Sequence, residues 1–117
     1  MEFVSAASVP APVLPFEEID CPPLGGKVKV RALLLTQRMG IAQRTANLKV
    51  KRPDEPEATN AIIPEVLAIC VCDGKDQPVY SRTRWDTFGA QHPALALELF
   101  NAAWRLSGMS GEASKKN

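Results

Sequence analysis

Polar and apolar residues alternate over residues 27–31, where Lys-Val-Lys-Val-Arg has the period of two that is typical of a half-buried β-strand. This pattern directs Val28 and Val30 toward the core. A short apolar and acidic segment, Phe16 to Cys21, comes before it, and the Pro-Pro-Leu-Gly-Gly sequence between them is a strong turn signal. The two segments are therefore predicted to pair as an N-terminal β-hairpin.

A helix is predicted next, over about residues 37–48, with Thr36 as its N-cap. Gly40 weakens this helix by about 1 kcal/mol relative to Ala. The polar, proline-containing residues 51–59 are expected to form a loop.

The apolar run from Val66 to Cys72 has two interpretations. Its β-branched residues favour a buried strand, followed by a turn and a second short strand over residues 79–81, which makes a central hairpin. A buried helix over residues 62–71 is the alternative, because periodicity alone does not separate the two in a short apolar run.

Helix-capping residues predict two helices in the C-terminal third. Ser81 is a good N-cap for a short helix that Gly89 ends. Pro93 suits the first position of a helix that runs to about Leu106, and Gly108 lies just past its end.

The predicted helix over residues 93–106 has an unusually wide apolar arc. The arc spans roughly 200°, about twice what a surface helix needs for packing on a core. Either the helix is nearly central in the fold, or part of the arc binds a partner or a second copy. The candidate partner-binding residues on this arc are Leu97, Phe100 and Trp104. The rest of the helix surface is a polar strip of Glu98, Asn101 and Arg105.

These elements together predict an α+β fold. The expected single domain covers residues 15–107 and has an N-terminal β-hairpin, a central short hairpin and three helices, the last one strongly apolar. An extended arm is expected over residues 1–14 and a disordered tail over 108–117. A chain of 117 residues that is 45% hydrophobic is long enough to build a core without disulfides or a metal.

Charge is segregated along the chain. Residues 1–26 hold four acids and no Lys or Arg, whereas residues 27–52 hold eight basic residues and no acid. The basic stretch offers candidate contacts to an acidic partner. Nucleic-acid binding is the alternative, although the stretch has no aromatic residue for base stacking. The candidate partner-binding cations are Arg38, Arg44, Lys49, Lys51 and Arg52.

The sequence shows no pattern typical of catalysis or metal binding. The single histidine, His92, precedes a proline and has no nucleophile and orienting group in a local arrangement. All three cysteines, Cys21, Cys70 and Cys72, are expected to be reduced. Cys70 and Cys72 lie in an apolar run, so they are expected to be buried, and a zinc site that they would form with Cys21 and His92 is not expected. We therefore expect a protein that is not an enzyme and needs no cofactor.

No apolar run approaches the roughly 18 residues of a membrane span, and the N-terminus lacks the basic region of a signal peptide. A cytoplasmic location is expected.

The order of these segments resembles the small tail assembly chaperones of long-tailed bacteriophages. The resemblance covers about residues 16–110. It depends on three segments: Phe16–Ile19 with the Leu24-Gly-Gly turn and Val28-x-Val30, the Asp73-Gly74-Lys75 turn before Trp85 and Phe88, and the closing helix over Leu95–Leu106.

The resemblance implies a binding role in the host cytoplasm. Proteins of this family associate with the long, largely helical tape measure protein and help tail-tube protein to assemble around it. Many are also extended by a ribosomal frameshift. Residues Lys115-Lys116-Asn117 fit this idea, because the slippery sequence A-AAA-AAC can encode them.

Overall fold

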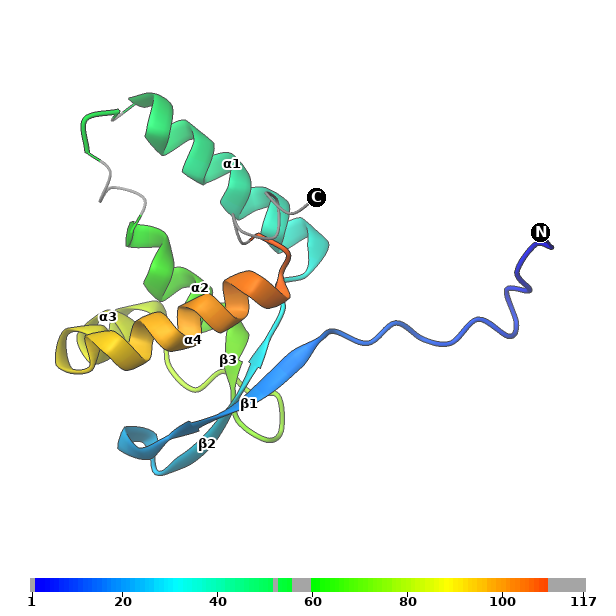
Figure 1. The fold of residues 1–117 in the computed structure, drawn as a ribbon, viewed down its shortest axis with the longest axis horizontal. Helices are drawn as coiled ribbons and strands as arrows, with labels where there is room; N and C mark the ends of the chain where they lie inside the picture. Colours follow the sequence, from blue (N-terminus) through cyan, green and yellow to red (C-terminus); the bar gives the residue numbers. More distant parts are fainter. Residues whose placement is uncertain (1, 52, 56–59, 110–117) are drawn as a thin grey trace.

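The computed structural model describes residues 2–51, 53–55 and 60–109. In this part of the chain, three short strands and four α-helices form one sheet with helices packed on one side of it (Figure 1), which confirms the α+β prediction. The elements in chain order are β1 (Phe16–Cys21), a 3₁₀ turn (Pro22–Leu24), β2 (Gly26–Arg31), α1 (Leu35–Lys51), α2 (Ile62–Cys70), β3 (Val71–Cys72), α3 (Arg82–Gln91) and α4 (Pro93–Leu106).

The N-terminal hairpin is confirmed. Strands β1 and β2 pair in antiparallel register from Phe16 opposite Arg31 to Cys21 opposite Gly26. Val28 and Val30 are buried, as the alternation predicts. The turn closes through Gly25, whose φ of 90° lies in the left-handed region that favours glycine.

The core lies between the sheet and helices α2, α3 and α4. Its largest fully buried side chains are Trp85, Leu67 and Leu99, together with Ile41 from α1. The rings of Trp85 and Phe88 meet edge to face at 5.1 Å, and Tyr80 packs edge-on against Trp85 at the same distance. Such edge-to-face pairs are favoured by the ring quadrupoles.

The prediction of a buried strand over residues 66–72 is wrong, and the helical alternative is correct for most of the run. Residues Ile62–Cys70 form α2, and only Val71 and Cys72 continue as strand β3 beside β2. The predicted central hairpin is reduced to a single bridge between Cys72 and Pro78. Helix α2 therefore adds a fourth helix to the three that were expected.

Helix α1 starts two residues earlier than predicted, and Thr36 is not its N-cap. The helix begins at Leu35, and the backbone N–H of Leu34 donates to the side-chain oxygen of Gln37 at 2.9 Å. This contact is one half of a capping box, in which the residue at the third helical position reaches back to the cap. At the other end, the helix continues through Lys51, into the region expected to be loop.

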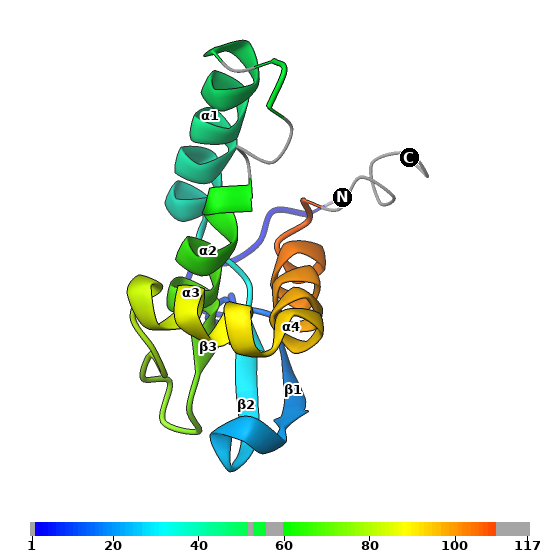
Figure 2. The same cartoon turned by 90° about the vertical axis from the view of Figure 1, so that its left-hand side faces the viewer.

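Helix α1 packs lightly against the rest of the protein and stands off it in both views (Figures 1 and 2). Ile41 is its one buried residue, and all of its residues belong to the described part of the chain. Leu35, Met39 and Val50 are 61% to 80% exposed. Hydrophobic side chains on this helix thus face solvent as well as the core.

Helices α3 and α4 have the predicted N-termini. Ser81 accepts a hydrogen bond from the N–H of Arg84, and Pro93 occupies the first turn of α4. Gly89 does not end α3, which continues to Gln91. A Cβ at Gly89 would lie 3.7 Å from that of Ala96, an ordinary van der Waals distance, so α3 and α4 pack side by side at this point.

Ser107 ties the end of α4 to the chain that leaves β2. Its hydroxyl donates to the carbonyl of Ala103 at 2.7 Å and accepts from the N–H of Leu33 at 2.9 Å. Both groups are buried. We expect Ser107→Ala to lower the free energy of unfolding by about 1–3 kcal/mol, because the Leu33 amide loses its partner. Urea denaturation tests this, with exposed Ser8→Ala as the control; equal effects of the two changes would contradict it.

The N-terminal arm and the C-terminal end lie at the margins of the described chain. Residues 2–15 contain a turn at residues 6–8 but neither helix nor strand, and they run away from the domain (Figure 1). Gly108, with a φ of 71°, follows the end of α4 as predicted. The predicted disordered tail beyond Met109, the Lys115–Asn117 hypothesis and Arg52 lie outside the described residues.

Candidate functional site

Helix α4 presents three different faces along its length. Ala96, Leu99, Ala102 and Ala103 are buried in the core. A second face carries Leu97, Phe100 and Trp104, which recur at the helical spacing of three and four residues. Leu97 is exposed, whereas Phe100 and Trp104 are partly buried against the edge of the core. A third face carries the polar strip. The wide apolar arc is therefore divided between core packing and an open surface.

The open apolar face of α4 borders a hollow of about 370 Å³ between α2, α3 and α4. Leu97 lies at its rim, and Ile63 and Leu67 of α2 form its wall. Trp85 also lines the hollow, and its indole Nε1 is buried with no hydrogen-bond partner among the described residues. Most buried indole N–H groups have an acceptor, so this unpaired group lowers the stability of the core somewhat.

A second hollow adjoins the first. Phe100 and Trp104 line it, with rings stacked at 5.1 Å and 28°, and Lys49 of α1 lies opposite them. Asn60 and Ile63 line both hollows, so the two form one continuous surface. We call this surface the α2–α4 face; it consists of Asn60, Ile63, Leu97, Phe100, Trp104 and the Lys49 side chain.

The structure brings together only some of the predicted partner-binding residues. Lys49 joins Phe100 and Trp104, as expected for a mixed apolar and cationic site. Arg44 instead forms an ion pair with Glu65 of α2. Arg38 donates to the carbonyl of Gly108 at 3.4 Å, and Lys51 is exposed at the far end of α1.

Several other cations of the basic stretch are engaged within the molecule. Lys29 pairs with Asp76 at 2.9 Å, and Lys27 lies 3.8 Å from Glu18. Lys29 also lies over the ring of Phe16. These contacts divide the stretch between the sheet and α1, so it does not form one continuous track for a phosphate backbone.

Cys70 and Cys72 are buried, as predicted, and Cys21 is buried as well. Burial raises the pKa of Cys70 to about 12 and raises the pKa of Cys21 and Cys72 as well. A thiol with a raised pKa is a poor nucleophile and a poor metal ligand at neutral pH. No group of three or more potential metal ligands occurs among residues 2–51, 53–55 and 60–109.

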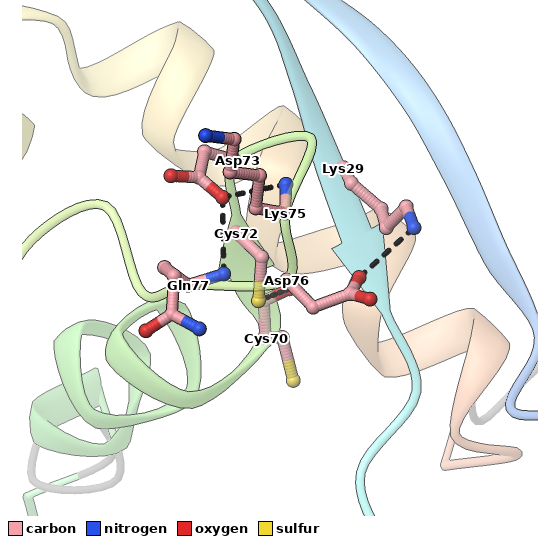
Figure 3. Close-up of polar contacts among 7 residues, drawn as sticks. All are labelled: Lys29, Cys70, Cys72, Asp73, Lys75, Asp76 and Gln77. Carbon is pink, nitrogen blue, oxygen red and sulfur yellow. Dashed lines mark hydrogen bonds and ion pairs between the residues drawn. The ribbon is translucent and has the colours of Figure 1, made fainter.

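The acidic segment after β3 is a hydrogen-bonded turn (Figure 3). The carboxylate of Asp73 accepts from the N–H groups of Gln77 and Lys75, which lowers its pKa. Asp76 adopts a φ of 64° and pairs with Lys29 of β2. Both acids thus stabilise the turn.

His92 is a junction residue. It connects α3 to α4, and its ring packs 5.0 Å from that of Phe88. His92 therefore lies in the turn between the two helices.

Asn60 and Ile63 were not among the predicted site residues, because the run that follows them was expected first as a strand. The exposed apolar residues of α1 were not among them either. Leu35, Met39 and Val50 recur at spacings of four and eleven residues, which puts them on one side of a helix. This spacing is visible in the sequence and could have predicted an apolar face on α1.

None of the helices in the described residues is long and apolar enough to cross a membrane. Comparison with protein-family models found no match to this chain, and comparisons with curated proteins and with solved structures found none either.

Proposed function

We propose that this chain is a protein-binding assembly factor that holds an apolar helical segment of another protein and carries out no catalysis. By its resemblance to the tail assembly chaperones of long-tailed phages, the partner is the tape measure protein, and the outcome is assembly of tail-tube protein around it. Its place of action is the host cytoplasm.

The observation that carries this proposal is the continuous α2–α4 face. Leu97, Phe100 and Trp104 span about 10 Å along α4, at 1.5 Å per residue. The two hollows that flank them share Ile63, so apolar side chains of a docked helix at positions i, i+3 and i+7 have adjoining places to enter. A groove that accepts a helix in this way holds its partner through a few buried apolar side chains, and it needs no catalytic residue.

The polar rim supports a reversible interaction. Lys49 stands at one end of the face, where it lines the second hollow. An acidic side chain of the partner would pair with Lys49. Charged rim contacts of this type set association rate and register more than affinity.

The test is co-expression with the tape measure protein of the same phage. We expect the wild-type chain to keep that protein in the soluble fraction and to co-purify with it. Leu97→Glu and Trp104→Glu should each reduce co-purification by about tenfold or more, because a charge replaces an apolar anchor. Val13→Glu, at an apolar position in the arm that is 81% exposed, makes the same kind of change away from the face and should have no effect.

Circular dichroism and melting temperature of the isolated variants provide the folding control. If well-folded Leu97→Glu and Trp104→Glu proteins still bind the tape measure protein normally, the α2–α4 face is not the binding site. If the wild-type chain instead shifts DNA or RNA in a gel, with binding that falls steeply as salt rises, the nucleic-acid alternative is correct.

A further inference from the structure

Helix α1 has an exposed apolar line on the side away from its buried residue, Ile41. Its members are spaced by four, three, four and four residues, so at 100° per residue they stay within roughly 80° of the helix surface over about 22 Å. We name this line the α1 stripe, and all of its residues are exposed: Leu35, Met39, Ala42, Ala46 and Val50.

The dimensions of the α1 stripe fit one helix. Apolar residues at spacings of three and four form the seam of a two-helix pair, which is narrower than the face by which a helix packs on a core. The small side chains of Ala42 and Ala46 lie in the middle of the stripe, where they let a neighbouring helix axis come close. The stripe therefore suits a helical occupant.

The charge of α1 is unbalanced. The helix carries four cations and no acid, and only Arg44 is paired, with Glu65 of α2. Among the described residues, no carboxylate pairs with Arg38, Lys49 or Lys51. Arg38 donates to a backbone carbonyl, which leaves its charge uncompensated. Three positive charges on this helix are thus available to acids of a partner.

Two of these cations lie along one edge of the stripe. Arg38 and Lys49 are eleven residues apart, which puts them on the same side of the helix at a separation of about 16 Å. The helix dipole favours Lys49 near the C-terminal end, but it disfavours Arg38, the fourth residue of a helix that has no acid in its first turn. The position of Arg38 is therefore not explained by the stability of α1.

The charges of α1 decide between possible occupants. A second copy is a poor one, because its own α1 holds no acid and, in an antiparallel pair, brings Arg38 and Lys49 against the same two residues. The N-terminal arm is a poor one as well, because Pro10, Pro12 and Pro15 prevent a continuous helix. An acidic amphipathic helix fits both the seam and the charges.

We propose that the α1 stripe binds an acidic amphipathic helix of another protein. The apolar residues of that helix pack along the stripe, and acids beside them pair with Arg38 and Lys49. Charged residues that flank a seam in this way set partner choice and orientation. The site does not depend on the proposed function, since Lys49 is the only residue that it shares with the α2–α4 face.

The probe is a peptide of about 18 residues, or five turns, that is held helical by a hydrocarbon staple on its outer side. It carries leucines at the spacing of the α1 stripe and glutamates on both flanks of that line. Fluorescence anisotropy gives its affinity, and amide chemical shifts locate it. We expect saturable binding with shifts in α1, and weaker binding as salt rises.

Two control peptides separate the contributions of the seam and of the charge. One has lysine in place of every glutamate, and the other has glutamine in place of every leucine. Each should bind at least about tenfold more weakly than the probe. Equal affinity of the probe and either control would overturn the proposal, because the site would then lack the charge preference or the apolar seam.

Protein variants place the probe on the stripe. Met39→Glu should raise its Kd by about tenfold or more, while Met39→Leu should leave it unchanged. Arg38→Glu should raise the Kd by about tenfold. Arg82→Glu makes the same charge change at an exposed position of α3 and should have no effect. The melting temperatures should match that of the wild type, because all three positions are exposed.

Two outcomes would identify a different arrangement. If Leu97→Glu weakens binding of the probe and Met39→Glu does not, the probe occupies the α2–α4 face and the proposal is wrong. Sedimentation of the protein alone should show a monomer. A dimer that Met39→Glu dissociates would identify a second copy as the occupant of the stripe, and the proposal would be wrong even if the tape measure interaction is intact.

Discussion

Leu99→Ala is expected to lower the free energy of unfolding by about 2–5 kcal/mol, whereas Leu97→Ala should lower it by less than about 1 kcal/mol. The two leucines lie two residues apart on the same helix. Leu99 is 0% exposed in the core, and Leu97 is 48% exposed at the rim of the first hollow. Truncation at Leu99 leaves a cavity that the neighbouring helices cannot fully fill, while Leu97 already contacts solvent.

Urea denaturation of the two variants measures this difference, and the substitution is the same at both positions. Helix propensity is equal in both, because the change is Leu to Ala each time. A loss at Leu97 as large as that at Leu99 would mean that the open face of α4 is part of the core, and it would remove the basis of the α2–α4 face.

Above pH 9, the free energy of unfolding should fall by up to about 1.4 kcal/mol per pH unit because of Cys70. Burial raises its pKa in the folded protein from an ordinary value of 9.0 to about 12. Between these values the unfolded chain loses the thiol proton and the folded chain keeps it. The contribution of the neutral thiol to stability is complete below pH 9 and is lost as pH rises toward 12.

Chemical denaturation at intervals between pH 7.5 and about 11 measures the slope. Cys70→Ala serves as the reference, because it keeps every other titrating group and removes this one. The wild-type curve should fall more steeply than the variant curve. Parallel curves would show that the Cys70 thiolate forms as easily in the folded protein as in the unfolded chain.

The accuracy of the sequence predictions depended on whether the signal was local. The hairpin and α4 were predicted correctly because a period of two, a proline at the first helical position and a glycine past the last turn act within a few residues. The helix over residues 62–70 was given only as the alternative, because Val66, Leu67 and Cys70 are all buried and leave no polar face. A segment that is apolar on every side shows neither the period of a strand nor that of a helix.

The same limit applies to the α2–α4 face. Phe100 and Trp104 follow from the width of an apolar arc, which is a property of one helix. Ile63 joins them only because α2 packs beside α4. This placement depends on tertiary packing, which no segment of the sequence encodes by itself.

Because α1 is attached lightly to the rest of the protein, stability places few demands on the residues along its exposed side. Leu35, Met39 and Val50 contribute almost nothing to folding, since they are exposed on a helix that is held at Ile41 and by the Arg44–Glu65 pair. Selection for stability alone would let these positions drift to polar residues, which are better tolerated on an exposed helix surface. Deep mutational scanning for abundance should accept Lys or Glu at all three. If a scan for biological activity rejects the same changes, their apolar character is maintained by a contact outside this molecule.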